Sequence, residues 1–217
     1  ALKILPLLDF KTICEHPKIL LGFSDITTLL VAMHQECNMV AFHGPLVTSL
    51  AQGSESTTTA LTNTLSSLNP LVLTPFRPEV VHPGKASGIV MGGNLTTLVH
   101  LVGTPFEPRL EGCLLFLEDR GEAPYRIDRM LTQLLFGGHL DGIAGIILGS
   151  FHDCGAGDDV CQIVKTMFQD RGIPILAGFD MGHGTENITL PIGLEAELNT
   201  VDASLRFKEA AVEDGAT

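Results

Sequence analysis

The sequence contains no long hydrophobic run and little positive charge. None of its uninterrupted apolar stretches approaches the ~18 residues that a transmembrane helix needs. Only 13 Lys and Arg residues stand against 25 Asp and Glu residues, so the formal net charge is −12. This charge repels nucleic acid and anionic membranes, and no basic cluster offsets it. We therefore expect neither nucleic acid nor a membrane among the partners.

Motifs for metal binding and for disulfide frameworks are also missing. The five cysteines are odd in number and include no C-x-x-C, and the eight histidines are scattered with no H-E-x-x-H. These absences argue against a disulfide framework, a zinc knuckle or any other metal site, so we expect no cofactor. The cysteine usage favours a reducing, cytoplasmic location.

The first part of the chain alternates between strand-like and helix-like segments. Residues 18–24 are strand-like, residues 25–36 have apolar residues at helical spacing, and residues 39–43 form a short apolar run. This alternation predicts an α/β fold with a parallel sheet. Before it, residues 2–9 read like the tail of a helix, so we expect the chain to be a fragment of a longer protein.

Prolines divide the chain. Four of them interrupt the stretch from Pro70 to Pro83, which cannot hold a long helix. We therefore expect an N-terminal unit at 1–70, a linker at 71–86 and a C-terminal unit at 87–217. Within the last unit the pattern predicts helices over 95–102, 125–136 and 159–171, strands over 113–117, 142–148 and 173–177, and a closing pair of strands at 188–190 and 196–198.

Ser24 lies where an α/β protein presents a nucleophile. It follows an apolar run and Gly22, and a helix-like segment begins just after it. However, Ile26 occupies the place of the second glycine in the G-x-S-x-G motif of common hydrolases. Serine is also a preferred helix N-cap, and in this segment alone the cap is the commoner use. Both interpretations stay open at this point.

Two further residues could assist a nucleophilic serine, one as a base and one as the acid that orients the base. Acyl transfer by serine requires a base and an acid that orients the base. Glu118 ends a buried strand, where α/β proteins place functional groups, although it could instead pair with Arg126 or Arg129 or cap the next helix. His183 lies between two glycines, where a histidine is more exposed than in a core, although a glycine-rich turn alone also explains it.

The other candidates are weaker. His43 could line a site, but a satisfied histidine at a strand end is the simpler interpretation. Gly93 and Asn94 could hold a ligand by backbone N–H groups at a helix start, and Asn94 is equally well explained as an N-cap. Cys113 is expected in the core. The loop cluster of His152, Asp153 and Cys154 has no clear ligand geometry.

Taken together, these segments resemble the LD-carboxypeptidase family, cytoplasmic serine peptidases that trim murein tetrapeptides. The resemblance spans nearly the whole chain. It is carried, in order, by the motifs Gly22-Phe23-Ser24-Asp25-Ile26-Thr27, Phe42-His43-Gly44-Pro45, Gly92-Gly93-Asn94-Leu95, the long run from Leu117 to Leu131, Ile147-Leu148-Gly149-Ser150-Phe151, Gly182-His183-Gly184 and Leu190-Pro191-Ile192-Gly193.

The resemblance assigns roles to single residues. It implies a triad of Ser24, Glu118 and His183, with the backbone N–H of Asp25 as one oxyanion donor and Gly93 with Asn94 near the substrate. It also implies an N-terminal parallel, Rossmann-like α/β domain, a C-terminal strand-rich α/β domain, an active site between them, no cofactor, and a homodimer. In the family a glycine-rich loop supplies the second oxyanion N–H, and this chain begins just after the matching position.

The implied activity is hydrolysis of the L-to-D peptide bond of murein tetrapeptides, which releases D-alanine during peptidoglycan recycling. Two alternatives remain from the sequence. One is a related serine peptidase acting on aminoacyl or peptidyl nucleotide amides of the microcin C type. The other is a non-catalytic fragment or pseudoenzyme, for which the expected absence of an oxyanion donor is the main argument.

Overall fold

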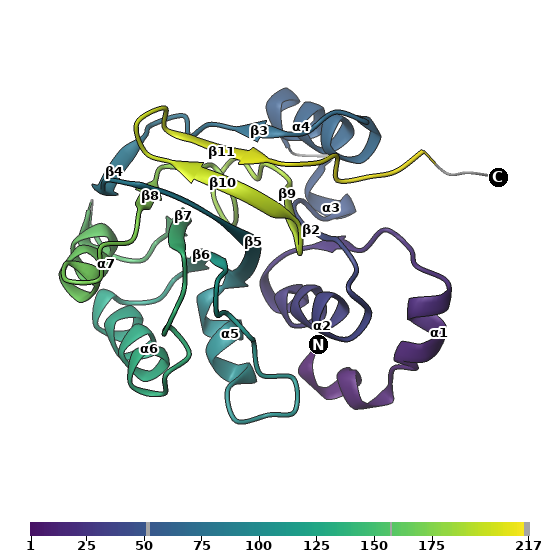
Figure 1. The fold of residues 1–217 in the computed structure, drawn as a ribbon, viewed down its shortest axis with the longest axis horizontal. Helices are drawn as coiled ribbons and strands as arrows, with labels where there is room; N and C mark the ends of the chain where they lie inside the picture. Colours follow the sequence, from purple (N-terminus) through teal and green to yellow (C-terminus); the bar gives the residue numbers. More distant parts are fainter. Residues whose placement is uncertain (51–52, 157, 215–217) are drawn as a thin grey trace.

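Two β-sheets of unequal size organise the chain (Figure 1). The computed structural model describes residues 1–50, 53–156 and 158–214. The smaller sheet has the order β1 (Leu21–Gly22), β2 (Ala41–His43) and β9 (Leu190–Ile192). In it β1 runs parallel to β2, and β9 runs antiparallel to β2.

The larger sheet has eight strands and a parallel centre. Its spatial order is β3 (Val72–Leu73), β11 (Ser204–Phe207), β10 (Glu195–Asn199), β5 (Lys85–Asn94), β6 (Leu114–Arg120), β7 (Gly145–His152), β8 (Ile175–Ala177) and β4 (Glu79–His82). Strands β5 to β8 are parallel, and the outer strands on both sides are antiparallel to their neighbours. The carboxyl ends of the central strands therefore lie along one edge of the sheet.

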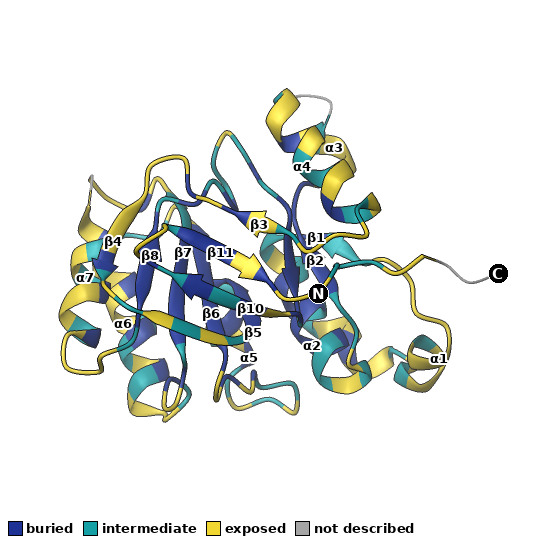
Figure 2. Cartoon of the chain, turned by 45° about the horizontal axis from the view of Figure 1, so that its top comes forward, coloured by how far each residue is buried: buried dark blue, intermediate teal, exposed yellow. Residues whose placement is uncertain are grey.

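The apolar runs of the central strands form the core. The side chains from Leu114 to Leu117 are completely buried, and so is that of Ile146 (Figure 2). Continuous burial of this kind is typical of parallel strands that are covered on both faces. One side of this sheet carries α5 (Leu95–Leu101), α6 (Pro124–Phe136) and α7 (Asp159–Phe168), while β10, β11 and β3 curve over the other side in Figure 1.

The first third of the chain also contains short helices. They are η1 (Leu2–Leu7), α1 (Phe10–Glu15), η2 (Ser24–Ile26), α2 (Thr27–Cys37), α3 (Val47–Leu50) and α4 (Glu55–Ser66). Local capping explains several ends: Ser54 accepts a hydrogen bond from the Thr57 N–H at the start of α4, and α2 stops where Asn38 turns left-handed at φ 51°. No helix in the described ranges is long and apolar enough to cross a membrane.

The predicted α/β class with a parallel sheet is confirmed, but one predicted pairing is wrong. The segments at 188–190 and 196–198 correspond to β9 and β10, which do not pair with each other. β9 joins β2 in the smaller sheet, whereas β10 joins β5 in the larger one. The expected linker at 71–86 contains β3 and β4, the two outermost strands of the larger sheet. Residues 51–68 are rich in serine and threonine, and of these residues 51 and 52 lie outside the described residues.

The cysteine pattern argued against a disulfide framework, but the structure contains one disulfide that the sequence did not predict. Cys14 of α1 and Cys37 at the end of α2 are bonded, with their Cα atoms 5.0 Å apart. Two residues far apart in sequence are brought together by helix packing, which neither an odd cysteine count nor the missing C-x-x-C reveals. Because disulfides are uncommon in the cytosol, cysteine usage no longer argues for a reducing compartment.

Candidate active site

Glu118 lies at the carboxyl end of β6 and is completely buried. Its Oε2 atom accepts a hydrogen bond from the backbone N–H of His183 at 3.2 Å and lies 2.7 Å from Nδ1 of the same residue. The alternative pairing with Arg126 is wrong, because Arg126 pairs with Glu122 at 3.2 Å. Helix α6 is preceded by Ala123, so Glu118 does not cap it either.

His183 lies on the segment that connects β8 with β9. Its side chain is 15% exposed, whereas the side chain of Glu118 is not exposed at all. The contact of Nδ1 with Glu118 leaves Nε2 as the nitrogen that can bind a hydroxyl group. A buried carboxylate at Nδ1 fixes the tautomer of the ring and stabilises an imidazolium, which is what a general base in acyl transfer needs.

The close contact between Glu118 and His183 requires a glycine at position 182. Gly182 has φ +113°, and a Cβ atom built there would lie 2.3 Å from Oε2 of Glu118. The carboxylate–histidine pair therefore requires a residue without a side chain at position 182, the first glycine of the Gly-His-Gly motif. Sequence reasoning had treated it only as a source of exposure for the histidine.

Gly182→Ala should separate the pair. We expect the catalytic rate of the protein to fall about 100-fold, because displacement of a catalytic group by about 1 Å has that effect. Gly172→Ala is the matched control: its φ is +64°, but nothing lies within 4 Å of the added Cβ, so it tests backbone strain alone. Equal activity losses in the two variants, measured at equal folded fraction, would contradict the steric explanation.

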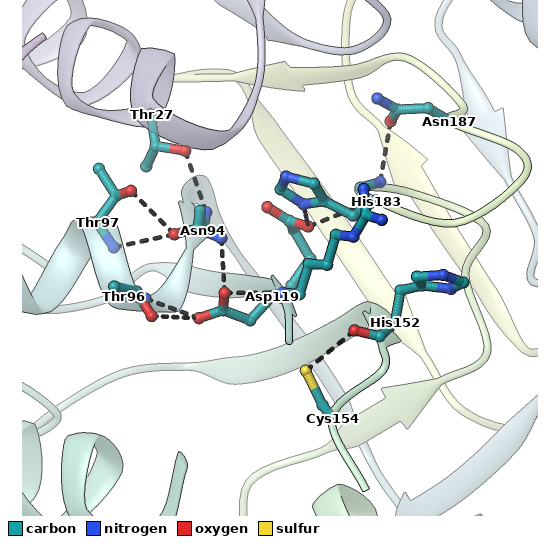
Figure 3. Close-up of polar contacts among 12 residues, drawn as sticks. Thr27, Asn94, Thr96, Thr97, Asp119, His152, Cys154, His183 and Asn187 are labelled. Atoms are coloured by element: carbon teal, nitrogen blue, oxygen red, sulfur yellow. Dashed lines mark hydrogen bonds and ion pairs between the residues drawn. The ribbon is translucent and has the colours of Figure 1, made fainter. Parts of the chain in front are cut away.

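The segment that carries His183 is anchored on the N-terminus of α4. The Gly182 N–H donates to Oδ1 of Asn187 at 2.9 Å (Figure 3), and the Asn187 N–H donates to Oγ1 of Thr57 at 3.2 Å. Oε2 of Glu186 accepts hydrogen bonds from Ser54, from Ser56 at 2.5 Å and from Thr57 at 2.8 Å. These bonds, from Ser54 above all, lower the pKa of Glu186. No sequence pattern pointed to this network, since its members are far apart in the chain.

Ser24 adopts a strained backbone conformation. Its φ is +60°, which is uncommon for a residue other than glycine. It is the first residue of η2, and its side chain caps neither η2 nor α2, so the capping interpretation is wrong. A Cβ atom at Gly22 would lie 2.8 Å from Cγ2 of Ile26, which explains the glycine before the turn. A strained turn between strand and helix is how the α/β-hydrolases expose a nucleophile.

Phe23 brings the Ser24 turn next to the histidine. The rings of Phe23 and His183 have centroids 4.7 Å apart and planes inclined at 62°. In this structure no hydrogen bond links Ser24 to His183, although both belong to the described residues. Asp25 is exposed, and its carboxylate contacts the amino group of Ala1.

Gly93 and Asn94 lie at the carboxyl end of β5, where Asn94 is in register with Glu118. Asn94 is buried and caps α5: its Oδ1 accepts from the Thr97 N–H at 3.0 Å, and its backbone N–H donates to Thr27 at 3.1 Å (Figure 3). A Cβ atom at Gly93 would lie 2.5 Å from Oγ1 of Thr27. The predicted cap is confirmed, and close packing of α2 against β5 accounts for the glycine.

Asp119 ties the end of β6 to the start of α5. Its Oδ1 accepts from the side-chain amide of Asn94 at 2.9 Å, and its Oδ2 accepts from the Thr96 N–H at 2.9 Å and the Thr96 hydroxyl at 2.8 Å (Figure 3). This carboxylate is therefore engaged in structure, while its neighbour Glu118 binds the histidine.

The remaining candidates stand apart from this pair. Cys113 is buried, and burial raises its pKa to about 11, as expected for a core thiol. Cys154 donates to the carbonyl of His152 at 3.4 Å, which makes this a local loop contact (Figure 3). Among residues 1–50, 53–156 and 158–214, no group of three or more His, Cys, Asp and Glu side chains is placed to hold a metal ion.

His43 is not the satisfied histidine that the sequence suggested. Its ring is completely buried, and neither ring nitrogen has a hydrogen-bond partner within the described part of the chain. Burial lowers its pKa to about 3, and the nearby charge of His183 acts in the same direction. The residue is therefore neutral at ordinary pH.

This depressed pKa makes stability depend on pH. A histidine of the unfolded chain titrates near about 6.5, so below that pH the unfolded state gains a proton that folded His43 does not accept. Its contribution is complete above pH ~6.5 and falls by about 1.4 kcal/mol per pH unit as the pH drops toward 3. Urea unfolding at pH 7 and pH 4 should show a smaller loss in His43→Phe than in the unmodified protein; equal losses would contradict the assignment.

A cavity of about 930 Å³ lies beside the His183 segment. It is lined by residues 178–181, by Thr185 and Glu186, and by Ser150 and Arg77 on facing segments. Ser24, Glu118 and His183 are not among its lining residues. The cavity therefore adjoins the segment that carries the histidine without containing the carboxylate–histidine pair.

A buried contact between Glu118 and His183 at the carboxyl edge of a parallel sheet, beside a strained serine turn, is an arrangement that serine hydrolases use. Models of the LD-carboxypeptidase N-terminal and C-terminal domains match residues 1–44 and 87–198. The chain belongs to the LD-carboxypeptidase family.

Individual relatives agree with this membership. A probable murein peptide carboxypeptidase of Bacillus subtilis (strain 168) is 40% identical over 96% of this chain and 68% of that protein. The crystal structure of an MccF-like protein from Bacillus anthracis superposes with a TM-score of 0.88 at 27% identity, covering 95% of this chain and 72% of that one. A muramoyltetrapeptide carboxypeptidase from Oxalobacter formigenes gives a TM-score of 0.84 at 29% identity over 95% and 72%. The chain thus spans about two thirds of the length of the curated relative.

Proposed function

We propose that this protein is a serine carboxypeptidase that hydrolyses the L-to-D peptide bond of murein tetrapeptides and releases D-alanine. The observation that carries the proposal is the buried contact of 2.7 Å between Glu118 and Nδ1 of His183. Ser24 supports it by its positive φ and its lack of any capping role. The names of two relatives, a murein peptide carboxypeptidase and a muramoyltetrapeptide carboxypeptidase, support the substrate class.

In the proposed mechanism, Nε2 of His183 takes the proton of Ser24 Oγ as this oxygen attacks the carbonyl carbon of the L-residue. Glu118 stabilises the resulting imidazolium. The C–N bond then breaks, His183 returns the proton to the departing amine of D-alanine, and an acyl-enzyme remains on Ser24. Water, deprotonated by His183, hydrolyses this ester and restores the hydroxyl group. Hydrogen bonds between nucleophile and base are often formed only in the substrate complex.

The backbone N–H of Asp25 is the proposed oxyanion donor, because it follows the nucleophile directly. Gly93 and Asn94 are proposed to form the wall of the substrate site beside Glu118, with which Asn94 is in register. The Asn94 side chain already caps α5. We therefore expect this wall to pack against the substrate and not to form a hydrogen bond to it through the Asn94 side-chain amide.

The direct test is an assay of the purified protein with two classes of substrate. We expect release of D-alanine from a murein tetrapeptide, detected by mass spectrometry, and slower cleavage of an aminoacyl sulfamoyl adenosine. The second class is included because the microcin C7 self-immunity protein MccF, whose structure in complex with aspartyl sulfamoyl adenosine has been solved, superposes with a TM-score of 0.86. If the adenosine amide were cleaved faster than the murein tetrapeptide, the adenosine amide would be the preferred substrate and the murein proposal would be wrong. A fluorophosphonate probe that fails to label Ser24 would favour the non-catalytic alternative.

We also propose where in the cell the protein acts and in which oligomeric state. We place the protein in peptidoglycan recycling in the cytoplasm, as a homodimer, on the strength of its family membership. Light scattering on the purified protein tests the dimer, and fractionation of the source cells tests the location.

A further inference from the structure

Four rings form a continuous series of edge-on contacts beneath the candidate active site. The ring column consists of Phe116, His43, Phe23 and His183. Successive ring centroids lie 4.8 Å, 6.1 Å and 4.7 Å apart, with planes inclined at 80°, 65° and 62°. Inclined rings at such distances are the favourable, edge-to-face arrangement.

The ring column connects the elements that carry all three residues of the proposed triad. Phe116 lies two residues before Glu118 on β6, so both side chains point to the same face of the strand. Phe23 directly precedes Ser24, and His183 is itself the last ring. His43, on β2 of the smaller sheet, lies between Phe116 and Phe23.

The base of the column cannot shift easily. Phe116 and His43 are both completely buried. A Cβ atom at Gly149 would lie 2.8 Å from Cε2 of Phe116, so this ring packs directly on the backbone of β7. Phe23 therefore cannot move toward the base of the column, because packed rings and not solvent fill the space there.

His43 behaves in this column as an uncharged ring. Both of its nitrogens lack a hydrogen-bond partner in the described residues, and burial keeps it neutral. Its contacts on both sides are made by aromatic rings.

Resting on the proposed function, we propose that Phe23 and His43 are positioning residues, which hold the His183 imidazole with Nδ1 on Glu118 and Nε2 free for Ser24. Glu118 fixes one edge of the imidazole, and the ring of Phe23 packs against it at 62°. Together these two contacts restrict rotation of the histidine side chain. Loss of the Phe23 ring would leave only one of them.

The test compares Phe23→Leu and Phe23→Tyr with the unmodified protein. Phe23→Leu should lower kcat about 10- to 100-fold with little change in KM, and slow fluorophosphonate labelling of Ser24 by the same factor. Phe23→Tyr, which keeps the ring, should restore both rates to within a few-fold. His43→Leu should act in the same direction as Phe23→Leu, and it provides a second variant should Phe23→Leu not fold.

Phe10→Leu is the matched control. It removes one ring of the Phe10–Phe106 pair, whose centroids are 6.1 Å apart and which lies outside the ring column, so kcat and labelling should stay unchanged. Normal rates in folded Phe23→Leu, a change confined to KM, or failure of Phe23→Tyr to restore the rates would overturn the inference. An unmodified protein that is not labelled at all would instead contradict the proposed serine nucleophile.

Discussion

Ser24→Ala should lower kcat for D-alanine release by about 10⁶-fold, the loss seen when a serine peptidase loses its nucleophile. In the proposed mechanism the hydroxyl oxygen of Ser24 forms the acyl-enzyme, and the alanine side chain has no nucleophilic atom to replace it. The strained φ of +60° persists in the variant, because alanine and serine meet similar backbone limits there. Binding of the tetrapeptide, measured by calorimetry, should change little.

Ser66→Ala is a suitable control for this substitution. Ser66 is exposed at the end of α4, and its hydroxyl donates to the Thr62 carbonyl at 2.7 Å. Its loss should leave kcat unchanged. More than about a tenth of the original turnover in folded Ser24→Ala would rule out Ser24 as the nucleophile, since such losses span several orders of magnitude.

The second large effect is expected for Glu118→Gln, which should lower kcat about 10⁴-fold with little change in KM. The amide keeps the shape of the side chain and can still accept from Nδ1 of His183. It carries no charge, however, so it cannot stabilise the imidazolium that forms as Ser24 loses its proton. The substituted residue is completely buried, and water therefore cannot take over this role.

Glu195→Gln gives the matched control, because Glu195 pairs with Lys208 on the surface of β10, away from the site. An exposed pair of this kind contributes about 1 kcal/mol or less, and its loss should not alter kcat. Circular dichroism melting of both variants separates loss of function from loss of fold. A folded Glu118→Gln protein with near-normal kcat would contradict the orienting role of the carboxylate.

The parts of the fold that the sequence predicted well are those with strong local patterns. Helix α6, expected at 125–136 and observed at Pro124–Phe136, buries Ile127, Leu131 and Leu134 at helical spacing and begins with a proline. Strand β6 begins with the apolar run from Leu114 to Leu117. In each case the residues themselves determine the element.

The elements that were missed depend on distant partners. Strand β3 has two residues and pairs with β11 at the edge of the described sheet, while β4 lies among the prolines that suggested a linker. Such short outer strands are defined by the neighbour that they bond to rather than by their own pattern. The disulfide between Cys14 and Cys37 likewise depends on a partner that is distant in the sequence, because helix packing brings the two cysteines together.

The candidate site was predicted only in part for a similar reason. Glu118 and His183 were each ambiguous alone, and the structure brings them together across 65 positions of the chain. The need for a glycine at 182, the anchoring of Asn187 on Thr57 and the unsatisfied nitrogens of His43 all arise from contacts between segments far apart in sequence. No local spacing encodes them.

The pairing of β2 with β9 bears on the order of folding. Ala41 is opposite Ile192, so this ladder closes a loop that includes most of the chain. Loops of that length cost more entropy to close than the local contacts within each βα unit, and such pairings form slowly. β2 lies beside the strand that leads to Ser24, and β9 directly follows the segment that carries His183. We therefore expect Ser24 and His183, the proposed nucleophile and base, to be brought together late in folding, after local secondary structure has formed.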